Sequence, residues 1–177
     1  MPTSRETARL AMEAGIPLAA EDDWPAIDLT IDGADEVGPH LDVIKGLGGA
    51  LLREKIVAAA TRRQIIVVDE GKLVSVLGSR GPLPVEVIRF GWAHTAAALQ
   101  RAGAREARLR RKGGAPFVTD EGHYLLDCDY PGITEPVGLA ATLCAIPGVV
   151  EHGLFLGLVH QVVVAAPGGT RILGVDP

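Results

Sequence analysis

The sequence predicts an α/β fold in which a Rossmann-like parallel sheet carries an inserted ferredoxin-like α+β lobe. Three observations lead to this prediction. Early in the chain a strand, a helix and a continuous apolar strand follow one another, as in a βαβ unit with parallel strands. The order then changes to β-α-β-β-α-β, the split pattern of ferredoxin-like lobes. Apolar segments follow near the C-terminus, and we expect them to return to the first sheet.

The first unit opens with a helix at residues 3–15. Thr3 and Glu6 have the spacing of a capping box, and Gly15 ends the helix. Residues 27–32 alternate apolar and polar side chains, the pattern of a half-buried strand. Next come an apolar piece at 41–45, a glycine-rich turn, a helix over about 49–62 and a strand at 64–69. That strand contains "IIVV", which is typical of a strand covered on both faces.

The inserted lobe is predicted from a second series of elements. They are a strand at 84–89, a helix at about 92–102 ended by Gly103, strands at 105–111 and 123–128, a helix at 136–145 beginning with Pro136, and a strand in "GVVEHGLF". We therefore assign residues 83–153 to the lobe. Residues 1–82 and 154–177 are assigned to the Rossmann-like domain.

Composition and charge argue against several classes of protein. The 47% of hydrophobic and 22% of charged residues are typical of a globular chain. A net charge of −5 argues against a nucleic-acid partner, and we expect the one basic run, residues 108–112, to be the solvated edge of a strand. No apolar run is long enough for a membrane span, and no signal peptide is recognisable. Cys128 and Cys144 lack metal-ligand spacing, so we expect free thiols in a reducing cytoplasm.

Carboxylates are concentrated at the end of the first predicted strand, where Asp32, Asp35 and Glu36 lie within five residues. Like charges this close raise one another's pKa or need counter-charges. Lys45 and Lys72 follow other predicted strand ends, and ligands of open α/β sheets bind at that edge. We therefore predict one pocket that holds the carboxylates and both lysines.

The turn "KGLGGA" precedes a predicted helix, so its backbone N–H groups are available to a ligand. It matches neither the dinucleotide-binding nor the Walker A glycine pattern. Periodicity does not distinguish Glu54 from Lys55 on this helix, because both have apolar neighbours at helical spacing. On pattern alone, "REK" is interpreted as a solvated charged face.

A metal site is the less favoured interpretation of the acidic cluster. The carboxylates of "DGADE" could hold Mg²⁺, but two nearby lysines argue against it. The five histidines show no ligand spacing. We therefore expect no metal.

The motifs together resemble the type A ribose-5-phosphate isomerases. The matching stretches are "DLTIDGADEV", "IKGLGGALLREKIV", "VVDEGK", "GPLPVEV" and "AIPGVVEHGLF". The resemblance extends over nearly the whole chain. It implies an aldose–ketose isomerase that interconverts ribose 5-phosphate and ribulose 5-phosphate through an enediolate. It also implies no metal or organic cofactor, a phosphosugar substrate and a homodimer.

The resemblance also implies roles for individual residues. Glu54 would be the general base, and Asp32, Asp35 and Lys45 would contact the sugar hydroxyls and assist proton movement. The backbone amides from Lys45 to Gly48 would face the developing oxyanion, and Lys72 would bind near the phosphate. The implied substrate-binding set is Asp32, Gly33, Ala34, Asp35, Lys45, Gly46, Leu47, Gly48 and Lys72.

The chain departs from the family pattern in two places. Leu47 stands where many members have glycine, but only its N–H need face a ligand. The family's first strand and its G-T-G-S-T phosphate loop are not found in this sequence, so we expect a fragment, a mis-called start or a decayed gene product with impaired activity. The alternative function is a phosphosugar-binding module like the effector domains of bacterial regulators, although no helix-turn-helix is recognisable.

Overall fold

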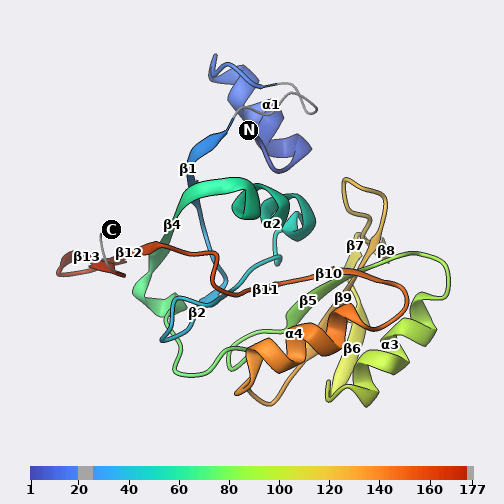
Figure 1. Ribbon diagram of the computed structural model, residues 1–177. Coiled ribbons are helices and arrows are strands. Elements are labelled where there is room, and N and C mark those ends of the chain that lie inside the picture. The colour runs from blue at the N-terminus through green and yellow to red at the C-terminus, as the bar shows by residue number, and fades with distance from the viewer. Residues whose placement is uncertain (20–25, 175–177) are drawn as a thin grey trace.

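The computed structural model describes residues 1–19 and 26–174 as two main sheets that lie in different parts of the molecule (Figure 1). The first sheet has the order β1-β4-β12-β13, in which β1 (Ile27–Asp32), β4 (Thr61–Asp69) and β12 (Gln161–Ala166) are parallel. β13 (Gly169–Leu173) pairs antiparallel with β12 at the edge. The predicted return of the C-terminal apolar segments to the first sheet is confirmed.

The helix α2 (Leu51–Ala60) connects the first sheet's parallel strands, as the βαβ pattern predicted. It is shorter than the predicted helix over about 49–62, and β4 begins directly at Thr61 rather than at residue 64. Thr61 is β-branched, its hydroxyl donates to Val57 O at 2.6 Å, and its backbone already pairs with Ile27 of β1. Strand pairing therefore ends the helix before the charged residues that follow.

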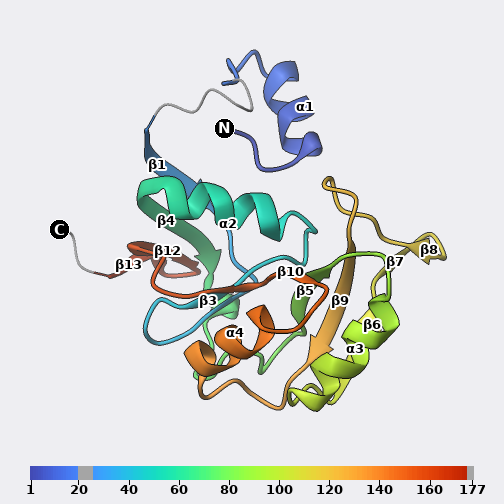
Figure 2. The same ribbon diagram turned by 45° about the vertical axis from the view of Figure 1, so that its right-hand side comes forward.

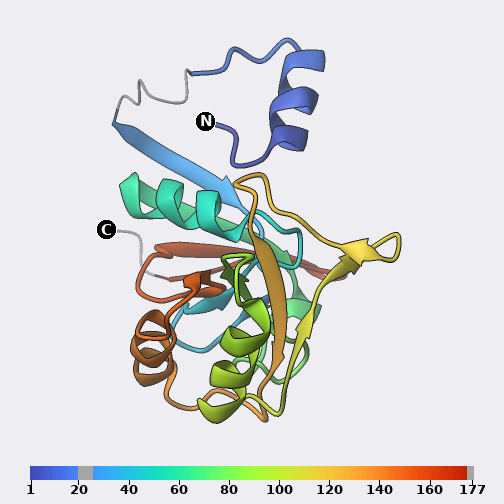
Figure 3. The ribbon, with the colours of Figure 1, turned by 90° about the vertical axis from the view of Figure 1, so that its right-hand side faces the viewer.

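The second sheet is antiparallel with the order β10-β5-β9-β6. Its elements are β5 (Leu83–Val87), α3 (Trp92–Arg101), β6 (Glu106–Leu109), β9 (Tyr124–Asp129), α4 (Pro136–Cys144) and β10 (Val149–His152). Side chains of α3 and α4 share one buried cluster with this sheet, and Figure 3 shows both helices on one of its faces. The chain is thus a mixed α/β protein with a parallel-dominated sheet and additional antiparallel sheets.

A small sheet, β11-β3-β2, lies between the two cores. It consists of β2 (Glu36–Val37), β3 (Val43–Ile44) and β11 (Leu154–Phe155). Within β3, Val43 belongs to the core of the parallel sheet and the next residue, Ile44, to the core of the second sheet. Successive residues of a strand face opposite ways, so this sheet is covered on both faces. The residue after β3, Lys45, is placed where the cores meet.

"GVVEHGLF" was predicted as one strand, but it forms β10 and β11 in two different sheets. The break is at Gly153, whose N–H donates to Pro84 O at 2.8 Å and whose carbonyl accepts from Lys45 N at 2.9 Å. A Cβ at this position would lie 2.2 Å from Lys45 O. Only glycine permits this close approach, which joins the two sheets beside Lys45.

Two further predictions need correction. The opening helix α1 (Arg5–Glu13) is capped by Ser4 rather than Thr3, and Glu6 bonds Arg9 instead of the cap. The strand predicted at 105–111 covers only 106–109, and a separate hairpin of β7 (Arg111–Lys112) and β8 (Ala115–Pro116) begins at Arg111. Figure 2 shows α1 outside both sheets, in keeping with its lack of buried residues.

Within residues 1–19 and 26–174, no helix has the length and apolar character needed to cross a membrane.

Candidate active site

Lys45 is the centre of a buried charge cluster at the carboxyl end of β1. Only 4% of its side chain is exposed, and its ammonium lies 2.9 Å from Asp32 Oδ2 and 3.3 Å from Glu54 Oε2. It also donates a hydrogen bond to Gly33 O at 2.6 Å. The next residue, Ala34, packs against the core of the parallel sheet. The prediction that Asp32, Lys45 and Glu54 come together is therefore confirmed.

Glu54 lies in the first turn of α2, and only 16% of its side chain is exposed. Burial raises the pKa of this carboxyl, Lys45 opposes the rise, and the nearby Asp32 and Asp35 add to it. The interpretation of "REK" as a solvated face is wrong. The Lys55 side chain is only 14% exposed and pairs with Glu151 at 2.6 Å. A raised pKa brings a carboxyl closer to the range in which it exchanges protons near neutral pH.

Asp35 is held by the glycine-rich turn, because its Oδ2 accepts from Leu47 N at 2.9 Å. Lys45 N already donates to Gly153 O, so two of the four amides expected to face an oxyanion are paired within the protein. The turn requires glycine at Gly46 and Gly49, whose φ angles are +110° and +94°. Gly48 has no neighbouring atom within 4 Å of where a Cβ would be, so its backbone borders open space.

Lys72 ends the short 3-10 turn η1 (Glu70–Lys72) that follows β4. It lines a pocket of about 430 Å³ together with Asp35, Leu47 and Arg80. Asp35 connects this pocket with the Lys45 cluster, because it lines the pocket and its charge also acts on Glu54. The predicted convergence on the sheet edge is found in two adjoining parts, with Lys72 in the outer one.

Glu36, the third clustered carboxylate, does not pair with a lysine. It is 2% exposed and accepts from three backbone N–H groups, those of Gly78 at 2.6 Å, Arg80 at 2.8 Å and Gly81 at 2.9 Å. Glu36 lines the Lys72 pocket, as expected, but backbone N–H groups rather than a lysine balance its charge. Glu36 fixes the 78–81 loop, which forms a wall of the Lys72 pocket.

Sequence reasoning missed Arg110, which lies in the basic run expected to be solvated. Its side chain is only 13% exposed and forms an ion pair with Asp127. The same guanidinium donates to Gly46 O at 2.9 Å and Leu47 O at 3.0 Å. Neither spacing nor composition separates Arg110 from the other arginines of the run, because its partners are distant in the sequence.

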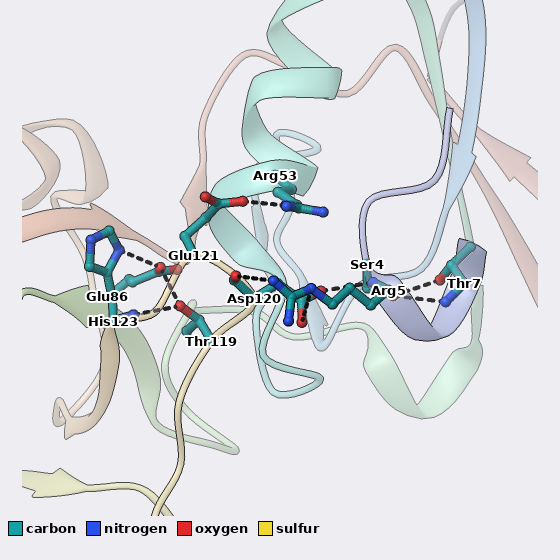
Figure 4. Close-up of polar contacts among 9 residues, drawn as sticks. All are labelled: Ser4, Arg5, Thr7, Arg53, Glu86, Thr119, Asp120, Glu121 and His123. Carbon is teal, nitrogen blue, oxygen red and sulfur yellow. Dashed lines mark hydrogen bonds and ion pairs between the residues drawn. The ribbon is translucent and has the colours of Figure 1, made fainter. Parts of the chain in front are cut away.

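A second polar cluster, separate from the one around Lys45, connects the start of α2 to the 119–123 loop (Figure 4). Arg53, next to Glu54, donates to Glu121 Oε1 at 2.5 Å. In the same 119–123 loop, Thr119 donates to the buried Glu86 at 2.9 Å, and His123 Nδ1 lies 2.9 Å from the same oxygen. Burial raises the pKa of Glu86, opposed by these hydrogen bonds. The loop thus joins α2 to β5.

The described part of the chain contains no group of three or more His, Cys, Asp or Glu side chains that could hold a metal ion. Cys128 is buried, Cys144 is exposed, and both are free. The arrangement supplies a buried carboxylate beside a lysine, and backbone donors next to open space. Chemically, this combination can move a proton next to a carbonyl and stabilise the negative charge that develops.

Comparisons with known proteins agree on one family. Residues 1–169 match the family model described as ribose 5-phosphate isomerase A (phosphoriboisomerase A). The ribose-5-phosphate isomerase A of Gloeobacter violaceus is 57% identical, over 98% of this chain and 75% of the relative. That of Roseiflexus sp. (strain RS-1) is 54% identical, over 96% of this chain and 72% of the relative. A solved D-ribose-5-phosphate isomerase in complex with phospho-erythronic acid superimposes with a TM-score of 0.93 at 39% identity, covering 99% of this chain and 77% of that one.

Proposed function

The chain belongs to the ribose-5-phosphate isomerase A family, and from this premise we propose that Glu54 is the general base of its reaction. The reaction is the aldose–ketose isomerisation of ribose 5-phosphate to ribulose 5-phosphate. Glu54 takes the proton from C2 of the open-chain aldose, which leaves an enediolate. The same carboxyl then returns a proton to C1, so the base is regenerated and no external reactant is consumed.

One observation carries this assignment, namely the burial of Glu54 beside Lys45. Burial raises the pKa of Glu54 and makes it a stronger base, while Lys45 opposes the rise. When Glu54 takes a proton, Lys45 remains paired with Asp32 at 2.9 Å. Proton uptake therefore leaves no unpaired buried charge.

The other site residues are assigned to binding and to proton movement between oxygens. Asp32, Asp35 and Lys45 contact the sugar hydroxyls, and the 46–48 turn presents a backbone amide to the oxyanion. Because Leu47 N is already bonded to Asp35, the Gly48 amide is the better-placed donor. Lys72 binds the phosphate in the adjoining pocket. A phosphorylated four-carbon acid such as phospho-erythronic acid is expected to bind the same site, as its complex with a relative suggests.

Deuterium exchange tests the base directly. In D2O the wild-type chain should incorporate deuterium at C1 of ribulose 5-phosphate, observed by NMR. Glu54→Gln keeps the shape of the side chain but removes the base, so kcat should fall roughly 10²–10⁴-fold while KM changes little. Glu13→Gln, whose side chain is 61% exposed, is the matched control. Unchanged kcat in Glu54→Gln would refute the assignment.

Several broader assignments stay proposals. Residues 1–82 and 154–177 form the Rossmann-like catalytic domain, and residues 83–153 form the ferredoxin-like lobe. The strand order β10-β5-β9-β6 supports the second assignment. A homodimer, cytoplasmic localisation and independence of metals and organic cofactors remain predictions.

A further inference from the structure

Arg110 reaches from the second sheet to the glycine-rich turn of the proposed active site. Its backbone is held on both sides, by Arg110 N donating to Leu125 O at 2.9 Å and by Phe117 N donating to Arg110 O at 2.8 Å. Its guanidinium meets both carboxylate oxygens of Asp127, with Nε 3.0 Å from Oδ2 and Nη2 bonded to Oδ1. Such a bidentate pair fixes the plane of the guanidinium. The side chain is therefore oriented before it reaches the turn.

The remaining donor, Nη1, bonds the carbonyl oxygens of Gly46 at 2.9 Å and Leu47 at 3.0 Å. A planar trans peptide directs its C=O and N–H to opposite sides. The Gly46 carbonyl shares its plane with the Leu47 N–H, which indeed points away from Arg110 and donates to Asp35 at 2.9 Å. By the same geometry, the Gly48 N–H, which shares a plane with the Leu47 carbonyl, also points away from Arg110.

Gly48 also borders open space, since a Cβ built on its Cα would meet no atom within 4 Å. A hydrogen bond to the carbonyl of a peptide polarises that peptide and strengthens its N–H as a donor. The packing supports the same orientation, because the centroid of the Phe117 ring lies 6.0 Å from the Arg110 guanidinium and the same ring occupies the space of a Cβ on Gly49.

From this geometry we infer that Arg110, oriented by Asp127, is a positioning residue that presents the Gly48 N–H to the oxygen that becomes negative during isomerisation. This inference rests on the proposed function of the Glu54 site. Arg110 itself touches only the far side of the turn, so its effect is exerted through the peptide planes on either side of Leu47.

Substitution of Arg110 tests the inference, because loss of a positioning residue should lower kcat and leave KM nearly unchanged. Arg110→Lys keeps the charge but cannot bond Asp127 and two carbonyls in one plane. Misplacement of a catalytic group can cost about 10²-fold, so kcat should fall to that extent while KM changes little. Asp127→Asn should act in the same direction. Arg111→Ala, an exposed neighbour whose guanidinium bonds Gly114 O, should leave kcat unchanged.

Thermal melting should accompany each assay so that only folded variants are compared. A folded Arg110→Lys with wild-type kcat would overturn the inference, as would a raised KM with unchanged kcat. NMR gives a readout besides activity. Addition of phospho-erythronic acid should shift the Gly48 amide resonance in the wild type, and shift it less in Arg110→Lys. An unmoved Gly48 resonance in the wild type would also overturn the inference.

Glu54→Gln, assayed in the same series, separates two kinds of failure. Loss of kcat in Glu54→Gln with full kcat in Arg110→Lys would overturn only the role of Arg110. Full kcat in Glu54→Gln would overturn the proposed function itself. In that case the Gly48 resonance would still report whether Arg110 orients the turn.

Discussion

Glu54 and Lys55 are neighbours on α2, yet they belong to two buried charge clusters of opposite character. Glu54 lies 3.3 Å from Lys45, in a cluster where carboxylates outnumber lysines. Lys55 bonds Glu151 at 2.6 Å and the carbonyl of His152 at 2.5 Å. The ammonium groups of Lys45 and Lys55 lie 5.7 Å and 5.0 Å from the same aromatic ring, that of Phe155.

The difference lies in how completely each charge is satisfied. Around Glu54, burial and then the neighbouring carboxylates raise its pKa against the opposing effect of Lys45, and the adjoining turn borders open space. Around Lys55, burial lowers the pKa of the ammonium but Glu151 opposes this change. In the first cluster, the Glu54 carboxylate is stabilised when it takes up a proton. In the second cluster, the charges of Lys55 and Glu151 balance each other. Unequal charge balance, rather than burial alone, distinguishes the proposed catalytic cluster from the cluster around Lys55.

Replacing either Lys45 or Lys55 with methionine should give the largest difference in behaviour between the two clusters. Lys45→Met removes the counter-charge of Glu54 and Asp32, so Glu54 should stay protonated and kcat/KM should fall about 10²–10³-fold. Lys55→Met should keep kcat/KM close to that of the wild type. It should lower the free energy of unfolding by roughly 1–3 kcal/mol, because Glu151 loses its partner. Assays and denaturant titrations of both variants check this, and equal losses of activity would contradict it.

The sequence predicted the arrangement of the parallel unit because its apolar runs and glycines act locally. The predicted strand at 27–32 is β1 without change, and the C-terminal strand pairs as expected. Lys45 and Asp32 were predicted to lie together from the rule that the carboxyl ends of parallel strands share one edge. They do meet, but β3 pairs antiparallel in the small sheet, so Lys45 reaches Asp32 from a different sheet. Glu54 was singled out only by the family resemblance, since Lys55 shows the same apolar spacing.

What the sequence could not predict depends on contacts between distant segments. Arg110 and Glu36 both bond backbone groups of other loops, and no local pattern indicates a backbone partner. The break at Gly153 follows from the close approach of Lys45 O, which exists only once both sheets have formed. Periodicity reports which face of a segment is buried, but not what covers it.

The cluster around Lys55 should make the stability of the protein depend on pH. His152 Nδ1 faces the ammonium of Lys55 at 3.2 Å and the N–H of Leu154 at 3.3 Å, both of which can only donate. Burial, then Lys55, lowers the pKa of His152 to about 4 from 6.5. Between these values the unfolded state binds more protons, so stability falls as the pH falls.

The size of this effect follows from about 1.4 kcal/mol per pKa unit, which gives roughly 3 kcal/mol between pH 6.5 and 4. Urea unfolding at several pH values should show the loss in the wild type and a smaller one in His152→Gln. His94→Gln, at an exposed position, is the matched control. Parallel pH curves for the wild type and His152→Gln would refute the assignment.

The smallest expected effect is the change in melting temperature when Glu54 or Glu151 is neutralised. The direction of this change distinguishes the two clusters. The pKa of Glu54 is raised in the folded protein, so the folded state binds more protons than the unfolded state above the ordinary pKa of 4.5. Stability therefore falls as the pH rises through the raised pKa, and the ionised carboxylate destabilises the folded state at neutral pH.

Glu54→Gln removes this destabilisation and should raise the melting temperature slightly at pH 7. Glu151→Gln should lower it, because the carboxylate that accepts from Lys55 at 2.6 Å is lost. Calorimetry of both variants at pH 7 and pH 5 decides the matter, since the gain in Glu54→Gln should shrink at the lower pH. Melting temperatures that move in the same direction would show that the two clusters are not balanced differently.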